Sequence, residues 1–149
     1  VFIPSTIDSL SKAVLAGILP LDSIVGGDIY FQGDIVWDLP AYLFRDCQLL
    51  IGMGNRVTVS KNADILLEGT KLSGCGRPWE TLRVNKDGKL HIRGGQVREA
   101  ETAIKVQAGG VLILQQTGFE GLETEVETEH FQPENNEAND RKNKLLLNR

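Results

Sequence analysis

The stretch Ile104-Lys-Val-Gln-Ala-Gly-Gly-Val-Leu-Ile-Leu114 decides the fold. It contains two short segments in which apolar residues alternate, Ile104–Val106 and Leu112–Leu114, separated by the glycine pair Gly109-Gly110. Alternation with a period of two is typical of β-strands. A small residue between two such segments indicates a tight bend of the backbone. We therefore expect two strands joined by a corner, with Gly109-Gly110 as corner glycines rather than a phosphate-binding loop, because no helix follows them.

The same pattern recurs earlier in the chain at nearly constant spacing. A second copy of the pattern lies 22 residues earlier, and a third lies 25 residues before the second. A fourth, weaker copy lies a further 22 residues earlier and consists of Ile35-Val-Trp37 and Leu43-Phe-Arg45. It is weaker because Arg45 occupies an inward position, and Leu50 is its third apolar position. The equivalent residues of the three strong copies are Val57/Leu82/Ile104, Val59/Val84/Val106, Ile65/Leu90/Leu112, Leu67/Ile92/Leu114 and Leu72/Val97/Phe119. The equal offset at every position indicates a structural repeat.

A repeat of 22–25 residues with about three short strands predicts one coil of a parallel β-solenoid (β-helix). About four coils would stack about 4.8 Å apart, with the equivalent residues as buried ladders. The competing fold is an antiparallel sandwich, which needs hairpin turns and no constant offset. The longer spacing before the second copy predicts a protruding loop over Gly74–Trp79.

The chain divides into three parts. Residues 1–27 are expected to form a helical cap and linker, because Ser5-Thr-Ile-Asp8 resembles a capping box and Ile7, Leu10, Val14 and Ile18 follow at helical spacing until Gly17 and Pro20. A helix of about 11–13 residues would cover the first coil. Residues 28–122 are expected to be the β-helix, with Asp28–Phe31 as its introductory strand. Residues 123–149 are expected to be a mobile or lightly docked polar tail, since Glu120–Asp140 contains eight acids and no Lys or Arg.

Length and charge restrict the classes of protein. The chain has 149 residues, 41% of them hydrophobic, and a net charge of −4. This suits one domain with a real core and disfavours nucleic-acid binding, since there is no basic excess to neutralise phosphates. The longest apolar run, Ala13–Leu21, is too short to span a bilayer. Because the chain begins at Val1 rather than Met, we expect a processed product or part of a longer protein.

The stretch Gly54–Gly121 resembles the right-handed parallel β-helix modules of large secreted and cell-surface proteins of Bacteroidetes-type bacteria. The resemblance rests on the segments Val57–Leu67, Leu72–Cys75, Trp79-Glu, Gly88–Ile92 and Glu99–Ile104. It implies a right-handed solenoid with a structural or adhesive role outside the cell, and it supplies no catalytic motif. The chain departs from this pattern after Phe119, where the acidic segment replaces further coils.

Few residues are candidates for a site. Trp79 and Arg77 in the protruding loop could bind a sugar, although a packing role for Trp79 is the alternative. Glu99 and Glu101, with Glu80 on the preceding coil, are the densest acidic cluster of the body. Glu99 and Glu101 are further candidates for carbohydrate binding, and a catalytic role of this cluster is the less expected alternative. An enzyme is less expected than a non-catalytic module, because the outward rows mix charges of both signs.

The spacing of the histidines and cysteines gives little support for a metal site or for cysteine chemistry. His91 and His130 have no second ligand at metal-binding distance in the sequence, so no metal or cofactor is expected. Cys47 is expected to align with Gly69 at a turn. A disulfide between Cys47 and Cys75 is one alternative, compatible with a secreted protein, and two separate thiols the other.

Three function classes are left open. The first is the structural or adhesive module, whose partner is a protein or polysaccharide surface. The second is a subunit that self-associates through its open end coil, Ile104–Phe119. The third is a β-helix that binds or processes carbohydrate, like a lyase or a phage tailspike.

Overall fold

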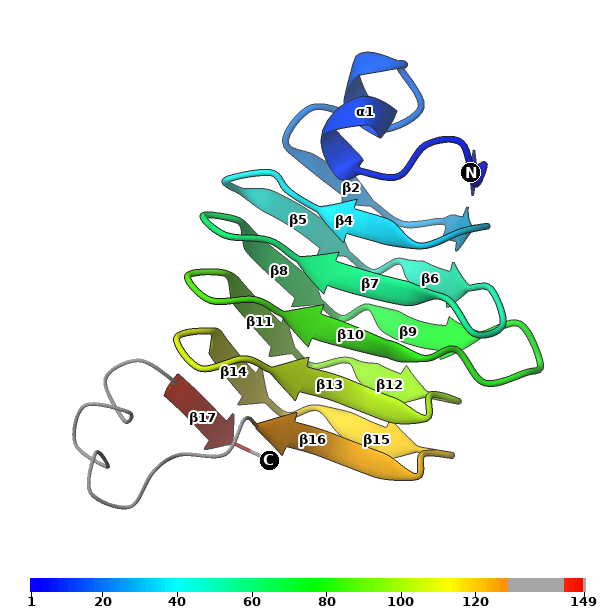
Figure 1. The fold of residues 1–149 in the computed structure, drawn as a ribbon. Coiled ribbons are helices and arrows are strands. Elements are labelled where there is room, and N and C mark those ends of the chain that lie inside the picture. Colours follow the sequence, from blue (N-terminus) through cyan, green and yellow to red (C-terminus); the bar gives the residue numbers. More distant parts are fainter. Residues whose placement is uncertain (129–143, 149) are drawn as a thin grey trace.

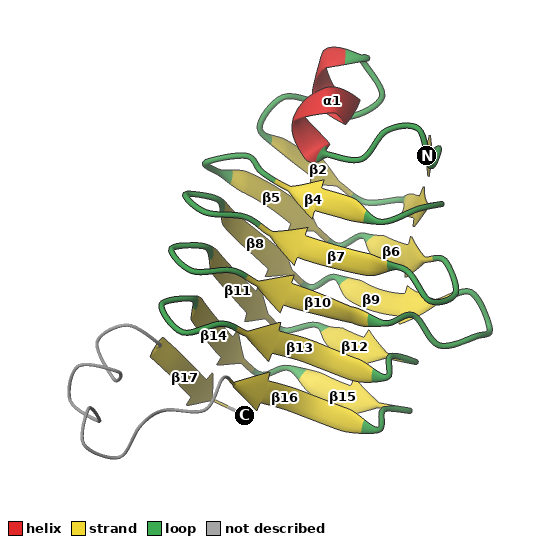
Figure 2. Cartoon of the chain, viewed as in Figure 1, coloured by secondary structure: helices red, strands yellow, loops and turns green. Residues whose placement is uncertain are grey.

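Three parallel β-sheets wind around one apolar core in the computed structural model of the chain, which describes residues 1–128 and 144–148. The chain passes through the three sheets in turn and descends in a right-handed sense, so that each sheet gains one strand per coil (Figure 1). Within the described residues the solenoid has about five turns and one short helix near the N-terminus (Figure 2). The expected parallel β-solenoid is confirmed.

The sheets are named here A, B and C. Sheet A consists of β1 (Phe2–Ile3), β3 (Asp28–Phe31), β6 (Gln48–Ile51), β9 (Lys71–Gly74), β12 (Gln96–Arg98) and β15 (Gly118–Glu120). Sheet B consists of β4 (Ile35–Trp37), β7 (Arg56–Val59), β10 (Thr81–Val84), β13 (Thr102–Val106) and β16 (Thr124–Thr128). Sheet C consists of β2 (Ser23–Val25), β5 (Tyr42–Arg45), β8 (Asp64–Glu68), β11 (Lys89–Arg93), β14 (Val111–Gln115) and β17 (Lys144–Asn148).

The five predicted ladders are all present in the strand register. In sheet B, Leu82 lies opposite both Val57 and Ile104, and the other four sets pair in the same way. All ladder residues except the half-buried Phe119 are buried, at most 1% exposed. Alternation explains this, because in each strand every second side chain points into the solenoid. Stacking of the coils therefore creates a core that no single coil could form.

In the first full coil β4 keeps the predicted register, with Ile35 opposite Val57, but β5 and β6 are shifted by one residue. Tyr42 lies opposite Ile65 and Phe44 opposite Leu67, so Arg45 points outward instead of inward. The path from Trp37 to Tyr42 is one residue shorter than the path between their partners Val59 and Ile65, and a slip of one residue moves every side chain to the other face. The shift persists into β6, where Leu49 rather than Leu50 pairs with Leu72.

The N-terminal helix is shorter than predicted and begins later. Helix α1 spans Leu10–Leu15, and its N-cap is Ser9, whose Oγ accepts a hydrogen bond from the Lys12 N–H (3.2 Å). The expected capping box over Ser5–Asp8 is wrong because this segment bonds to neighbouring coils: the Asp8 carbonyl, for example, accepts from the Val36 N–H (2.8 Å). Helix α1 packs on β4 and covers that end of the solenoid, as expected (Figure 1).

The solenoid extends beyond both boundaries expected for it. Strands β1 and β2 lie in the segment expected to be cap and linker, and they pair with β3 and β5. Strands β16 and β17 lie in the segment expected to be a polar tail, and they pair with β13 and β14. In β16, Val126 continues the Ile104 ladder and Thr128 lies opposite Val106. The acidic segment 129–143 lies outside the described residues.

Candidate functional site

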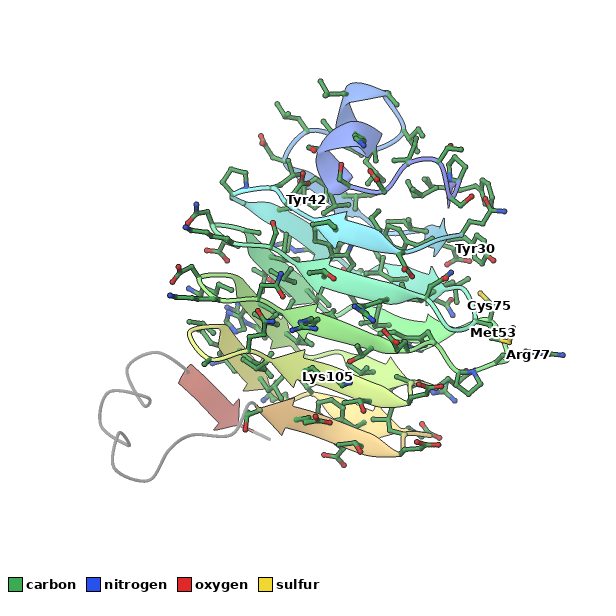
Figure 3. The ribbon with its side chains drawn as sticks, in the orientation of Figure 1. Tyr30, Tyr42, Met53, Cys75, Arg77 and Lys105 are labelled. Atoms are coloured by element: carbon green, nitrogen blue, oxygen red, sulfur yellow. The ribbon has the colours of Figure 1, made fainter. Side chains whose placement is uncertain are left out.

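The loop between β9 and β10 projects from one corner of the solenoid, as the insertion predicted. It runs beside the loop of the preceding coil, where the Gly54 N–H donates to the Pro78 carbonyl (3.1 Å). The exposed guanidinium of Arg77 donates to Sδ of Met53 at 3.6 Å. Figure 3 shows Cys75, Met53 and Arg77 gathered at this corner. Arg77 and Met53 are therefore accessible groups of the two projecting loops.

Trp79 belongs to the core, although it lies at the end of this loop. Its side chain is fully buried, and its indole Nε1 donates to the carbonyl of Arg98 at 2.8 Å. Its backbone forms a parallel bridge with Ala100 of the next coil. A buried ring presents no face on which a sugar could stack, so the structure favours the packing alternative for Trp79.

The three acidic residues near this corner differ in their burial and in their contacts. Glu80 forms an ion pair with Arg56 of the coil before it, and the hydrogen bond from Arg56 holds the pKa of Glu80 below its usual value. Glu99 occupies a left-handed backbone conformation (φ 59°) and is half-buried, while Glu101 is exposed. A general acid needs a raised pKa, which Glu80 lacks. The ion pair with Arg56 therefore disfavours Glu80 as a general acid.

The two cysteines are free thiols at different corners of adjacent coils. Cys75 lies in the projecting loop, where burial and then the charge of Glu99 raise the pKa of its thiol. Cys47 is buried between β5 and β6, and burial raises its thiol pKa too. Raised pKa values keep both sulfurs protonated and poorly nucleophilic. The structure does not contain the disulfide considered for this pair.

Cys47 occupies a corner position opposite Thr70 rather than the predicted Gly69. Its Sγ donates to the carbonyl of Arg45 (3.3 Å), and Thr70 Oγ1 donates to the carbonyl of Phe44 in the coil before (2.8 Å). Thr117 repeats this bond to Ile92 two coils further along (3.1 Å). These side chains satisfy carbonyls at the strand ends of sheet C, so their role is structural.

A groove that the sequence did not reveal lies between α1 and sheet B. It has a volume of about 500 Å³ and is lined by carboxylates, hydroxyls and cations above the side chain of Val36. Asp38 accepts from both the N–H and the Oγ of Ser11 (2.9 and 2.6 Å), and Asp8 pairs with Lys12 (2.8 Å). Such a set can hydrogen-bond a polyhydroxylated ligand. The sequence did not predict this groove, because α1 and β4 come together only in the folded chain.

The outer faces of the sheets carry the mixed charge rows that the register predicted. Lys105, labelled in Figure 3, lies between Arg83 of the coil before and Glu127 of the coil after it. On sheet C, His91 hydrogen-bonds Gln115 (2.7 Å) instead of approaching a metal-ligand set. In the described part of the chain, no three His, Cys, Asp or Glu side chains gather as a metal site would require. His130 lies outside the described residues.

Comparison with protein-family models, with curated proteins and with solved structures gives no match for this chain. Among the described residues, no helix is long and apolar enough to cross a membrane. The geometry thus defines the class of the protein as a parallel β-solenoid.

Proposed function

We propose that the chain is a non-catalytic structural or adhesive module of a secreted or cell-surface protein, in which the solenoid acts as a rigid spacer or a presentation surface. The single observation that carries this proposal is the continuous core. One cluster of buried side chains extends from Ile3 to Leu114 and joins all three sheets. A core without a break along the solenoid axis resists bending and local opening, which suits a load-bearing module.

The surface supports the same function. Charged side chains at the corners and on the outer faces pair with opposite charges of the neighbouring coil, as in Arg56–Glu80 and Arg98–Glu120, the latter at 3.5 Å. Arg45–Glu68 (3.6 Å) is a further pair of this kind. Each pair links two coils, so these side chains complement the stacking of the ladders.

The extracellular location rests on the resemblance of Gly54–Gly121 to β-helix modules of secreted and cell-surface proteins. Its test is fractionation of the producing cells. Recovery of the protein at the surface or in the medium supports the proposal, and recovery in the cytoplasm alone would overturn it.

The non-catalytic part is tested with a panel of acidic and neutral polysaccharides, by measuring new reducing ends and new unsaturated products. We expect no turnover above that of the double variant Glu99→Gln/Glu101→Gln, which removes both of these corner carboxylates. Turnover by the parent that is lost in this variant would establish an enzyme and overturn the proposal. A matched variant elsewhere on the surface, Asp87→Asn, controls for contaminating activity.

The groove between α1 and sheet B favours a second candidate, a carbohydrate-binding module. Asp38 and Asp8 present carboxylate oxygens beside Lys12, Arg56 and the hydroxyls of neighbouring residues. Binding would be measured on a glycan array and then by calorimetry. Asp38→Asn should weaken binding at least tenfold, while Asp87→Asn, two coils further along the same corner of the solenoid, leaves it unchanged. Equal binding by both variants would place any sugar elsewhere.

A further inference from the structure

The outer face of sheet C differs from that of sheet B, because its central column is apolar. The central side chains of β5, β8 and β14 are Leu43, Leu66 and Ile113, all partly exposed, with His91 of β11 between the last two. The equivalent column of sheet B is mostly polar and charged. The residues that flank the apolar column of sheet C are Asp64, Lys89 and Val111 on one side and Arg45, Glu68, Arg93 and Gln115 on the other.

The charges that flank this column are arranged in a self-complementary order. Asp64 in β8 is followed by Lys89 in β11, and Glu68 in β8 is followed by Arg93 in β11. Consider a two-fold axis parallel to the strands that passes between β8 and β11. A second copy related by this axis presents the same columns with the order of coils reversed. Asp64 then faces Lys89 of the second copy. Glu68, which also pairs with Arg45 and Arg93 of its own chain, faces Arg93 of the second copy, so opposite charges meet at four places across the face.

The shape of the face follows the same symmetry. A hollow of about 290 Å³ lies at its N-terminal half, beside the small side chain of Ala41, with Leu43 and Leu66 as apolar walls and the carboxylates of Asp22 and Asp64 at its edge. The same axis places β14 of the second copy over β5. The larger side chains Val111 and Ile113 of the second copy thus come to lie over this hollow. An apolar column that is hollow at one half and filled at the other is complementary to a reversed copy of itself.

We propose that the outer face of sheet C is the interface of a homodimer with this two-fold symmetry. Six strands spaced about 4.8 Å apart, with about five residues of about 3.3 Å each, offer a face of roughly 450 Å² per copy. Two such faces bury roughly 900 Å² in total, which is at the low end of specific interfaces. An interface of this size is typical of weak, transient association, and it pairs two modules side by side with opposite coil directions.

The charge order provides a direct test by sedimentation velocity on the full chain. Asp64→Lys sets the new lysine against Lys89 of the second copy, and Lys89→Asp sets the new aspartate against Asp64 of the second copy. Each variant alone should have a dissociation constant raised about tenfold or more, because two ion pairs become two repulsions. An equimolar mixture of the two variants should recover a dimer, since both contacts become attractive in the mixed pair. The double variant Asp64→Lys/Lys89→Asp should also dimerise.

The controls separate this interface from other associations. Lys71→Glu, on the outer face of sheet A, should leave the dissociation constant unchanged, and circular dichroism with urea unfolding confirms that each variant is folded. A parent that stays monomeric at millimolar concentration overturns the proposal. A dimer that persists in both single variants also overturns it and points to pairing through the open end of the solenoid. Failure of the mixture to form a heterodimer contradicts the proposed axis.

Discussion

Substitution of Ile92 probes the buried ladders most simply. Ile92 is fully buried and lies between Leu67 and Leu114 in one ladder of sheet C. Truncation to alanine leaves a cavity with stacked neighbours above and below, and the adjacent coils are hydrogen-bonded and cannot collapse into it. We expect Ile92→Ala to lower the free energy of unfolding by about 3–4 kcal/mol, in the upper part of the range for such truncations.

The assay is urea unfolding followed by circular dichroism at dilute protein. With an m-value of about 2–3 kcal/mol per molar urea, Ile92→Ala should lower the midpoint by about 1–2 M. Ile92→Val should cost only about 0.5–1.5 kcal/mol, whereas Ile92→Asp should prevent folding because it buries a charge without a partner.

The matched control is the next residue along the strand. Arg93 points outward with its side chain 49% exposed, and its contact with Glu68 spans 3.9 Å. Exposed pairs of this kind contribute about 0–1 kcal/mol, so Arg93→Ala should move the midpoint little. If Ile92→Ala and Arg93→Ala lower the midpoint equally, the inward and outward assignment of β11 is wrong.

Three further changes probe the corners. Thr70→Val removes the hydroxyl that donates to the Phe44 carbonyl and accepts from the buried Cys47 N–H, and it should cost about 1–3 kcal/mol in urea unfolding because that N–H loses its acceptor; a cost near zero would contradict this role of the hydroxyl. Gly94 has a φ of 66° and open space at its Cβ position, so Gly94→Ala should cost about 1–2 kcal/mol and Gly94→Asn less; equal costs would contradict a conformational origin. The pKa of Glu80 is lower in the folded chain than its ordinary value of 4.5, because Arg56 hydrogen-bonds the carboxylate. The contact therefore stabilises the fold at pH values above 4.5, and this stabilisation is lost as the pH falls through the pKa of the folded chain. The difference in unfolding midpoint between the parent and Glu80→Gln should therefore shrink on acidification, and a difference that grows would refute this reading.

The stacked ladders were predictable from sequence because two regularities coincide in them. Alternation identified the strands, and the equal offset of Val57, Leu82 and Ile104 fixed their parallel register. Each inward position in these coils is occupied by an aliphatic residue, so no other register buries them all. The corner at Gly109-Gly110 followed from the same pattern, and Gly109 has a positive φ of 89°.

The first coil was misread because the repeat length alone could not locate its shorter turn. Tyr42 and Phe44 are as suitable for the core as Leu43, and the choice between the two registers depends on the turn that contains Pro40. The predicted register buried Arg45, and this argued against it, because burial of an unpaired guanidinium costs free energy. The structure resolves this cost by placing Arg45 outside beside Glu68.

The candidate site was less accessible to sequence reasoning than the fold. Trp79 lies in an insertion, where an aromatic residue suggests a binding surface, but the indole Nε1 bond to Arg98 depends on contact with the next coil. The groove of Asp38 and Ser11 joins residues 27 apart in the chain, and no repeat relates them. Strand β16 was hidden because its acidic side chains are exposed and Val126 is its only apolar residue.

Disulfide trapping tests the stacking of the coils most directly. Thr58, Arg83 and Lys105 are outward neighbours on three successive strands of sheet B. In a background of Cys47→Thr and Cys75→Ser, cysteines at 58 and 83 or at 83 and 105 should cross-link on mild oxidation, because coils about 4.8 Å apart fall within disulfide reach. Cysteines at 58 and 105 lie about two coil spacings apart, near 10 Å, and should not cross-link. Ready trapping of the 58–105 pair, or failure of both neighbouring pairs, would contradict the solenoid.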